Sequence, residues 1–123
     1  MMFSFIKSKQ TEFTQAVQRR IHPRQRTRLR PAKLANLNNE FICDCSIRDI
    51  SDGGLRILLN QDTDLPNEFY VFDVVHRNVS EVELCWRKEL DAGVQFVVPP
   101  ANIRHFSNTG LQRLAQRLYA MDD

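Results

Sequence analysis

The sequence is poor in the residues that form covalent or metal-bound scaffolds. It contains three cysteines, Cys43, Cys45 and Cys85, and no CxxC spacing. This pattern excludes a disulfide framework and a four-ligand zinc site, so we expect reduced, structural thiols. There is also no run of about 18 or more apolar residues, and the apolar start at residues 1–6 is too short for a secretory signal or a membrane span. These absences favour a cytoplasmic protein.

Patterns typical of catalytic sites are missing as well. His22, His76 and His105 lie far apart in the chain, with no HxH or HExxH spacing, so we expect no metal site. The sequence has no GxSxG nucleophile elbow, and it shows no histidine and aspartate arranged around a serine. We therefore expect a binding protein and no enzymatic activity.

What the chain does have is the composition of one globular domain with an uneven charge. Its 123 residues are 42% hydrophobic and 26% charged. Residues 1–34 hold nine Lys and Arg against one acidic residue, whereas residues 35–123 hold eight against fourteen. The basic segment is a candidate for binding an anion such as a phosphate, a nucleic acid or a lipid head group. The alternative is a solvated basic tail.

Alternation of apolar and polar residues predicts a mainly β domain. Cys43, Cys45 and Trp86 lie at alternating positions of their strands and are assigned to the core. Pro31 is expected to keep the segment before it off a central strand. Short strands at this spacing are typical of an antiparallel barrel or sandwich. The expected strands are residues 41–48, 55–59, 68–75, 80–86 and 93–98, with a turn at 49–54.

The two ends of the chain are expected to differ from this β region. Residues 1–18 form an N-terminal extension in which a short amphipathic helix could begin. After Pro99 and Pro100, residues 101–123 are expected to form one helix, packed on the barrel or on a partner. A capping box starts at Thr109. The apolar stripe of this helix consists of Leu111, Leu114, Ala115 and Leu118.

Two short motifs stand in order along the chain. Residues 19–24 read Arg-Arg-Ile-His-Pro-Arg, and residues 49–54 read Asp-Ile-Ser-Asp-Gly-Gly. They resemble the RRxxxR and (D/N)xSxxG motifs of PilZ domains, which are receptors for the bacterial second messenger cyclic di-GMP. Further matches extend the resemblance to residue 98. It implies a PilZ-like split barrel of six antiparallel strands in residues 19–100, with a C-terminal α-helix and a flexible basic N-terminal segment.

The arginines have chemistry that fits such a ligand. A guanidinium can pair with a phosphate, fork onto guanine O6 and N7, or stack on the base. We assign these contacts to Arg20 and Arg24, with Arg19 as a third. The resemblance implies that an arginine at position 19 goes with the binding of two stacked cyclic di-GMP molecules. Two other registers stay open, Arg24 with Arg28 and Arg26 with Arg30.

The second motif supplies polar atoms for a base. Asp49 can accept hydrogen bonds from guanine N1–H and the N2 amino group, and Ser51 can donate or accept at a base edge or phosphate. Gly54 permits a positive φ or the close approach of a ligand. The alternative is a plain turn in which Asp49 and Ser51 bond to their own backbone.

We therefore expect a single-domain receptor and adaptor for cyclic di-GMP. Binding would order the basic segment, and the new surface would pass the signal to an unidentified effector protein. Motility, polysaccharide synthesis and virulence are the outputs that the resemblance implies. Two alternatives remain: a nucleic-acid-binding barrel, which is less favoured, and a PilZ-like interaction module that binds no nucleotide.

Overall fold

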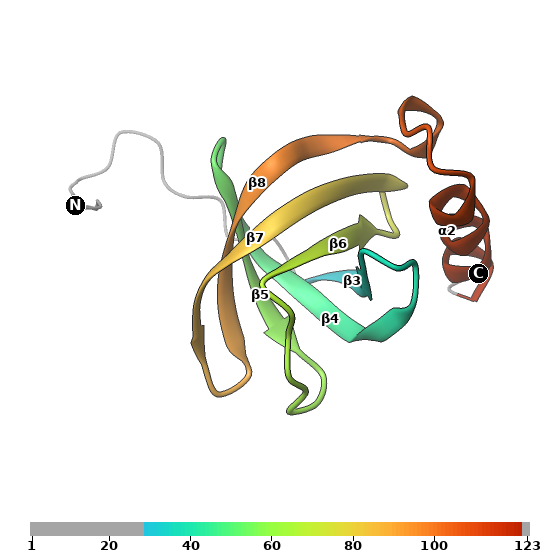
Figure 1. Ribbon diagram of the computed structural model, residues 1–123. Helices are drawn as coiled ribbons and strands as arrows, with labels where there is room; N and C mark the ends of the chain where they lie inside the picture. The colour runs from blue at the N-terminus through green and yellow to red at the C-terminus, as the bar shows by residue number, and fades with distance from the viewer. Residues whose placement is uncertain (1–28, 122–123) are drawn as a thin grey trace.

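The computed structural model describes residues 29–121, which form a six-stranded antiparallel barrel followed by one helix (Figure 1). The barrel closes in the order β3-β4-β5-β8-β7-β6. This confirms the predicted mainly β fold with a closed barrel and a C-terminal helix. The elements are β3 (Arg30–Asn36), β4 (Phe41–Ile50), β5 (Gly54–Leu59), β6 (Glu68–Asp73), β7 (Asn78–Lys88), β8 (Asp91–Asn102), the 3-10 turn η1 (Ile103–His105) and α2 (Thr109–Met121).

The barrel interior is filled by the apolar residues that alternate along the strands. Cys43 and Cys45 are both 3% exposed and belong to this interior cluster, as the alternation on β4 predicted. Phe41 lies two residues before Cys43, where strict alternation would place it on the same face, but it is 44% exposed because a bulge between Leu34 and Ala35 shifts the pairing of β3 with β4. The interior therefore begins one pair further along β4 than the sequence indicated.

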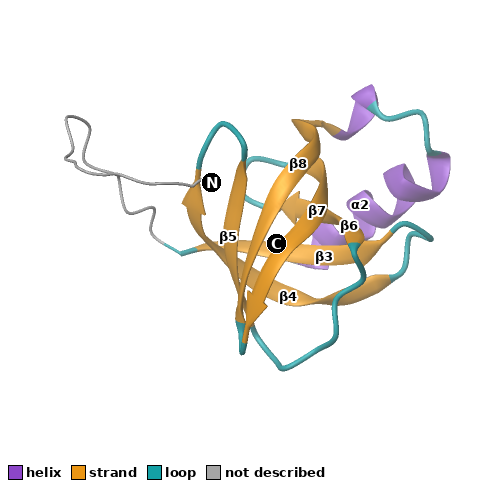
Figure 2. Cartoon of the chain, turned by 60° about the vertical axis from the view of Figure 1, so that its left-hand side comes forward, coloured by secondary structure: helices purple, strands orange, loops and turns teal. Residues whose placement is uncertain are grey.

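The helix α2 lies against the outside of the barrel, on the side away from the β4–β5 turn (Figures 1 and 2). The predicted stripe of Leu111, Leu114, Ala115 and Leu118 is buried there, together with Tyr119. Its partners on the barrel are the outward-facing residues Ala35, Tyr70, Phe72 and Val79 of β3, β6 and β7. No helix in the described range is long and apolar enough to cross a membrane.

The start of α2 differs from the predicted capping box. Asn108, one residue before Thr109, is the cap, because its side-chain oxygen accepts a hydrogen bond from the Leu111 backbone N–H at 3.0 Å. Gln112 donates its side-chain amide to the Phe106 carbonyl instead of reaching back to the cap. The sequence allows both a capping box that starts at Thr109 and a cap by Asn108 alone. In the structure the cap is Asn108, one residue before the predicted one.

Two strands, β3 and β8, contain prolines. Strand β3 includes Pro31 and was not among the strands predicted from alternation, although it pairs with both β4 and β6. Pro31 was expected only to keep the segment before it off a central strand. Pro31 pairs only with β4, at the very start of the strand, so no ladder hydrogen bond toward β6 is lost. Strand β8 continues through Pro99 and Pro100, because beyond Gln95 it pairs only with β7. Each proline thus lies where β3 or β8 has one neighbour.

Most of the predicted N-terminal site lies before the first described residue, Leu29. The extension at residues 1–18, its short helix and the arginines at 19, 20 and 24 all lie outside the described residues. The alternative partners Arg26 and Arg28 lie outside them too. Arg30, the last of the alternative arginines, stands at the start of β3, and its Nη2 is 2.9 Å from Asp73 Oδ2. Its guanidinium is therefore engaged by a barrel carboxylate.

Candidate functional site

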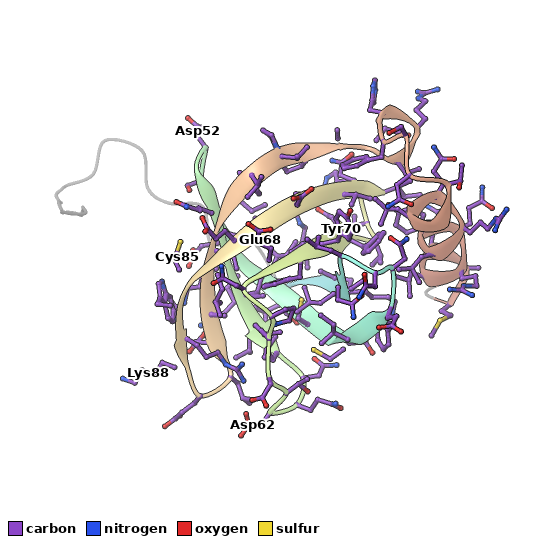
Figure 3. The ribbon with its side chains drawn as sticks, in the orientation of Figure 1. Asp52, Asp62, Glu68, Tyr70, Cys85 and Lys88 are labelled. Atoms are coloured by element: carbon purple, nitrogen blue, oxygen red, sulfur yellow. The ribbon has the colours of Figure 1, made fainter. Side chains whose placement is uncertain are left out.

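The predicted turn at residues 49–54 is a tight connection between β4 and β5. Asp49 still belongs to β4, and Gly54 opens β5. The Ser51 backbone N–H donates to the Gly54 carbonyl at 3.0 Å, and the Gly54 N–H donates to Ser51 Oγ at 3.2 Å. The Phe96 N–H donates to the Gly53 carbonyl, which ties the turn to β8. Ser51 thus bonds to its own backbone, as the plain-turn alternative predicted, and Asp52 points outward at the tip (Figure 3).

Gly54 does not have the positive φ that was one of its two predicted roles. None of the described glycines adopts a positive φ. A Cβ on Gly54 would instead collide with the Val94 carbonyl oxygen and lie 2.9 Å from Gln95 Cα. Glycine is needed here because the backbone of β8 passes against β5 at this point. This close contact draws the turn onto β8.

A pocket of about 480 Å³ opens beside this turn on the outer face of the barrel. Its volume falls within the range of about 300–1,000 Å³ that is usual for small-molecule sites. The three site residues predicted within the described range all line it. The structure therefore brings this motif to a hollow that the sequence could not show. The lining residues important here are Asp49, Ser51, Gly54, Arg56, Trp86 and Gly93.

Trp86 forms one wall of the pocket, so its assignment to the core was wrong. Its side chain is 45% exposed. A bulge between Leu84 and Trp86 on β7 interrupts the alternation that predicted an inward tryptophan. Trp86 then pairs with Gly93 of β8, where an added Cβ would collide with the indole Nε1. The missing side chain at Gly93 lets the indole lie against the β8 backbone, with the rest of the ring system open to a ligand.

Charged side chains form a short network along one side of the pocket. Asp49 of β4 pairs across the ladder with Arg56 of β5, and Arg56 Nη1 lies 3.7 Å from Asp49 Oδ2. Arg56 Nε lies 3.6 Å from Asp91 Oδ1, and Arg48 Nη1 lies 3.6 Å from the same oxygen. The two carboxylates and two guanidiniums therefore balance in charge. Of these four groups, Asp49 and Arg56 line the pocket.

Cys85 also lines the pocket and is exposed, unlike the two thiols of the interior. It is a free thiol, and it does not pack in the core as expected of a structural cysteine. Desolvation and the neighbouring Glu83 carboxylate raise the pKa of this thiol. A raised pKa keeps the sulfur protonated at neutral pH, and a protonated thiol is a poor nucleophile.

Two residues of the pocket had no role in the sequence-based site. Arg56 follows the glycine pair of the turn, and strand alternation on β5 places it outward beside Asp49. That signal was present in the sequence. The exposure of Trp86 was not, because bulges depend on how two strands pair in space. Within residues 29–121 no cluster of three or more His, Cys, Asp and Glu side chains could hold a metal ion.

Comparison with known families gives one clear match. The family model for the PilZ domain matches residues 18–108, which is most of the chain and includes both motifs. No curated protein matches the sequence. The matched region contains the whole barrel and the pocket beside the β4–β5 turn.

Proposed function

Because the chain belongs to the PilZ domain family, we propose that it is a receptor that binds cyclic di-GMP in the pocket beside the β4–β5 turn. The observation that carries this proposal is that Asp49, Ser51 and Gly54 of the second motif line one pocket with an exposed tryptophan. A family of binding modules also agrees with the expectation that the chain is no enzyme.

The pocket offers the contacts that a guanine needs. The Asp49 side chain is 23% exposed and presents an acceptor for N1–H and the N2 amino group. The Trp86 indole supplies a flat apolar surface on which a purine can stack. Ser51 uses its hydroxyl to hold the turn, so its proposed part is to shape the pocket and to accept one further hydrogen bond.

The phosphates require cations, and the proposal assigns them to Arg19, Arg20 and Arg24. These residues precede β3, whose first residue, Arg30, lies within the barrel wall. Guanidinium groups can fork onto phosphate oxygens or guanine O6 and N7. A few such contacts reach micromolar affinity, about −8 kcal/mol. One or two stacked nucleotides per chain fit this assignment.

The proposed role is that of an adaptor in the cytoplasm. A nucleotide bound between the arginine segment and the barrel creates a composite surface that neither part presents alone. An effector protein that recognises this surface binds only when cyclic di-GMP is present, because the ligand favours one state of the pair.

A calorimetric titration with a matched pair of variants tests the proposal. Asp49→Ala removes an acceptor that lines the pocket. Asp52→Ala removes the same charge from the tip of the same turn, where the side chain does not line the pocket. We expect saturable binding of cyclic di-GMP by the full chain with a stoichiometry of one or two. Asp49→Ala should weaken it about 10- to 100-fold, and Asp52→Ala should leave it within about twofold.

The same titration separates the alternatives. Equal losses in the two variants, or an Arg24→Ala variant that binds as well as the wild type, would contradict the proposed site. Steeply salt-dependent binding to unrelated oligonucleotides would favour a nucleic-acid-binding barrel. A partner captured with the same affinity with and without cyclic di-GMP would favour an interaction module that binds no nucleotide.

A further inference from the structure

We infer that Arg56 is a specificity-determining residue of this pocket: beside Asp49 it reads the O6–N1 edge of a guanine and so discriminates against adenine. The inference rests on the proposed function, since it names which barrel residue selects the base. Arg56 belongs neither to the basic segment nor to the second motif. It lines the pocket because β5 pairs it with Asp49 of β4.

The first step is the placement of two opposite charges side by side. Asp49 and Arg56 are direct cross-strand partners, and Arg56 Nη1 lies 3.7 Å from Asp49 Oδ2. Both line the same pocket. An acceptor and a donor therefore lie next to each other in the lining of one pocket.

The second step is the chemistry of the two purines. Guanine presents the O6 acceptor beside the N1–H donor, whereas adenine presents the N6 amino donor beside the N1 acceptor. An ionised carboxylate only accepts and a guanidinium only donates. The pair Asp49 and Arg56 thus matches guanine at both atoms. Against adenine it sets donor against donor and acceptor against acceptor, which leaves polar groups unpaired.

The third step is that the guanidinium is oriented without using up its donors. Both ion pairs of Arg56, at 3.6 and 3.7 Å, are longer than a hydrogen bond. Arg56 Nε and Asp91 Oδ1 are buried and have no hydrogen-bond partner among the described residues. The side chain is 42% exposed, so its Nη atoms reach the pocket. Asp91 therefore fixes the direction of the guanidinium by charge, and the Nη donors remain for a ligand.

Arg48 provides a matched control within the same network. Its Nη1 lies 3.6 Å from the Asp91 oxygen that Arg56 also faces, yet Arg48 does not line the pocket. Its side chain is 40% exposed, against 42% for Arg56. Replacing either residue removes one positive charge at a similar exposure and one ion pair to Asp91. Only Arg56 should change which base is bound.

The test is a calorimetric titration of the full chain with cyclic di-GMP and with cyclic di-AMP. The variants are Arg56→Ala, Arg48→Ala and Arg56→Met, the last of which keeps an unbranched aliphatic stem on β5. We expect the wild type to prefer cyclic di-GMP, and both Arg56 variants to lose about 10- to 100-fold in affinity for it. Their affinity for cyclic di-AMP should not fall, so the selectivity ratio drops. Arg48→Ala should keep both the affinity and the ratio.

Inosine separates the edge atoms further, because cyclic di-IMP keeps O6 and N1–H and lacks the N2 amino group. If Arg56 reads O6, Arg56→Ala weakens cyclic di-IMP by the same factor as cyclic di-GMP. An unchanged selectivity ratio in both Arg56 variants, or an equal loss in Arg48→Ala, would overturn the inference while leaving the receptor function intact. A wild-type chain that binds no cyclic di-GMP would overturn the proposed function itself.

Discussion

At the scale of single residues, Tyr119 shows how a buried polar group links stability to pH. Its ring packs edge-to-face on Phe72, with centroids 6.3 Å apart, and its hydroxyl is buried with no partner in the described part of the chain. Burial raises the pKa of this hydroxyl to about 12. The folded state therefore favours the neutral phenol, whereas the unfolded chain ionises near pH 10. This stabilising difference exists below pH 10 and is lost as the pH rises to 12.

Tyr119→Phe should remove this dependence. The variant keeps the ring contact with Phe72 and removes an unsatisfied hydroxyl. At pH 8 its free energy of unfolding should therefore be at least that of the wild type, and at most about 1 kcal/mol higher. Between pH 10 and 12 the gap should widen in favour of the variant. Urea denaturation across this range measures both, and the buried Cys45, whose pKa is also raised, affects both proteins alike. Parallel pH curves would contradict the assignment.

At the scale of elements, strand alternation predicted most of the barrel, because a closed sheet has one apolar face. It placed Cys43 and Cys45 inside correctly. It failed where pairing in space overrides the local pattern. Residues 32–35 were not predicted as a strand, yet they pair with both β4 and β6, and the bulge on β7 turned Trp86 outward. The Asp49 turn could be predicted from the sequence as part of a candidate site, whereas the pocket wall formed by Trp86 required the structure.

Gly54 of β5 and Gly93 of β8 should respond very differently to alanine. In Gly54→Ala the new Cβ meets the Val94 carbonyl, which is backbone and cannot move without disturbing the barrel. We expect the variant to lose about 3 kcal/mol or more. In Gly93→Ala the Cβ meets the Trp86 indole, a partly exposed side chain that can swing away, so the loss should be about 1 kcal/mol.

The effect of Gly93→Ala on the affinity for cyclic di-GMP should be larger than its small effect on stability suggests. Gly93→Ala stays folded but displaces the Trp86 wall, so its affinity for cyclic di-GMP should fall about tenfold, within the range measured for the loss of one base-stacking contact. Thermal unfolding and calorimetry on both variants measure the two effects. A Gly93→Ala variant that binds like the wild type would show that the indole does not contact the nucleotide.

At the scale of the whole molecule, the β4–β5 turn and the helix α2 lie on separate parts of the barrel (Figures 1 and 2). The Asp49–Gly54 turn and Trp86 form one side, and α2 covers the outward faces of β3, β6 and β7 on another. Ligand binding therefore need not disturb the contact between the helix and the barrel. The proposed receptor would then respond at the pocket, with α2 left in place on a separate part of the barrel.

The most direct test of this account is an NMR titration of the isotope-labelled full chain with cyclic di-GMP. The chain has a single tryptophan, so the Trp86 indole N–H gives one unambiguous signal from the pocket. The account predicts that this signal, the amides of Ser51 and Gly54, and the amides of Arg19, Arg20 and Arg24 shift together and saturate at the same nucleotide concentration. Shifts confined to residues 19–24, with the Trp86 and Gly54 signals unchanged at saturation, would contradict it.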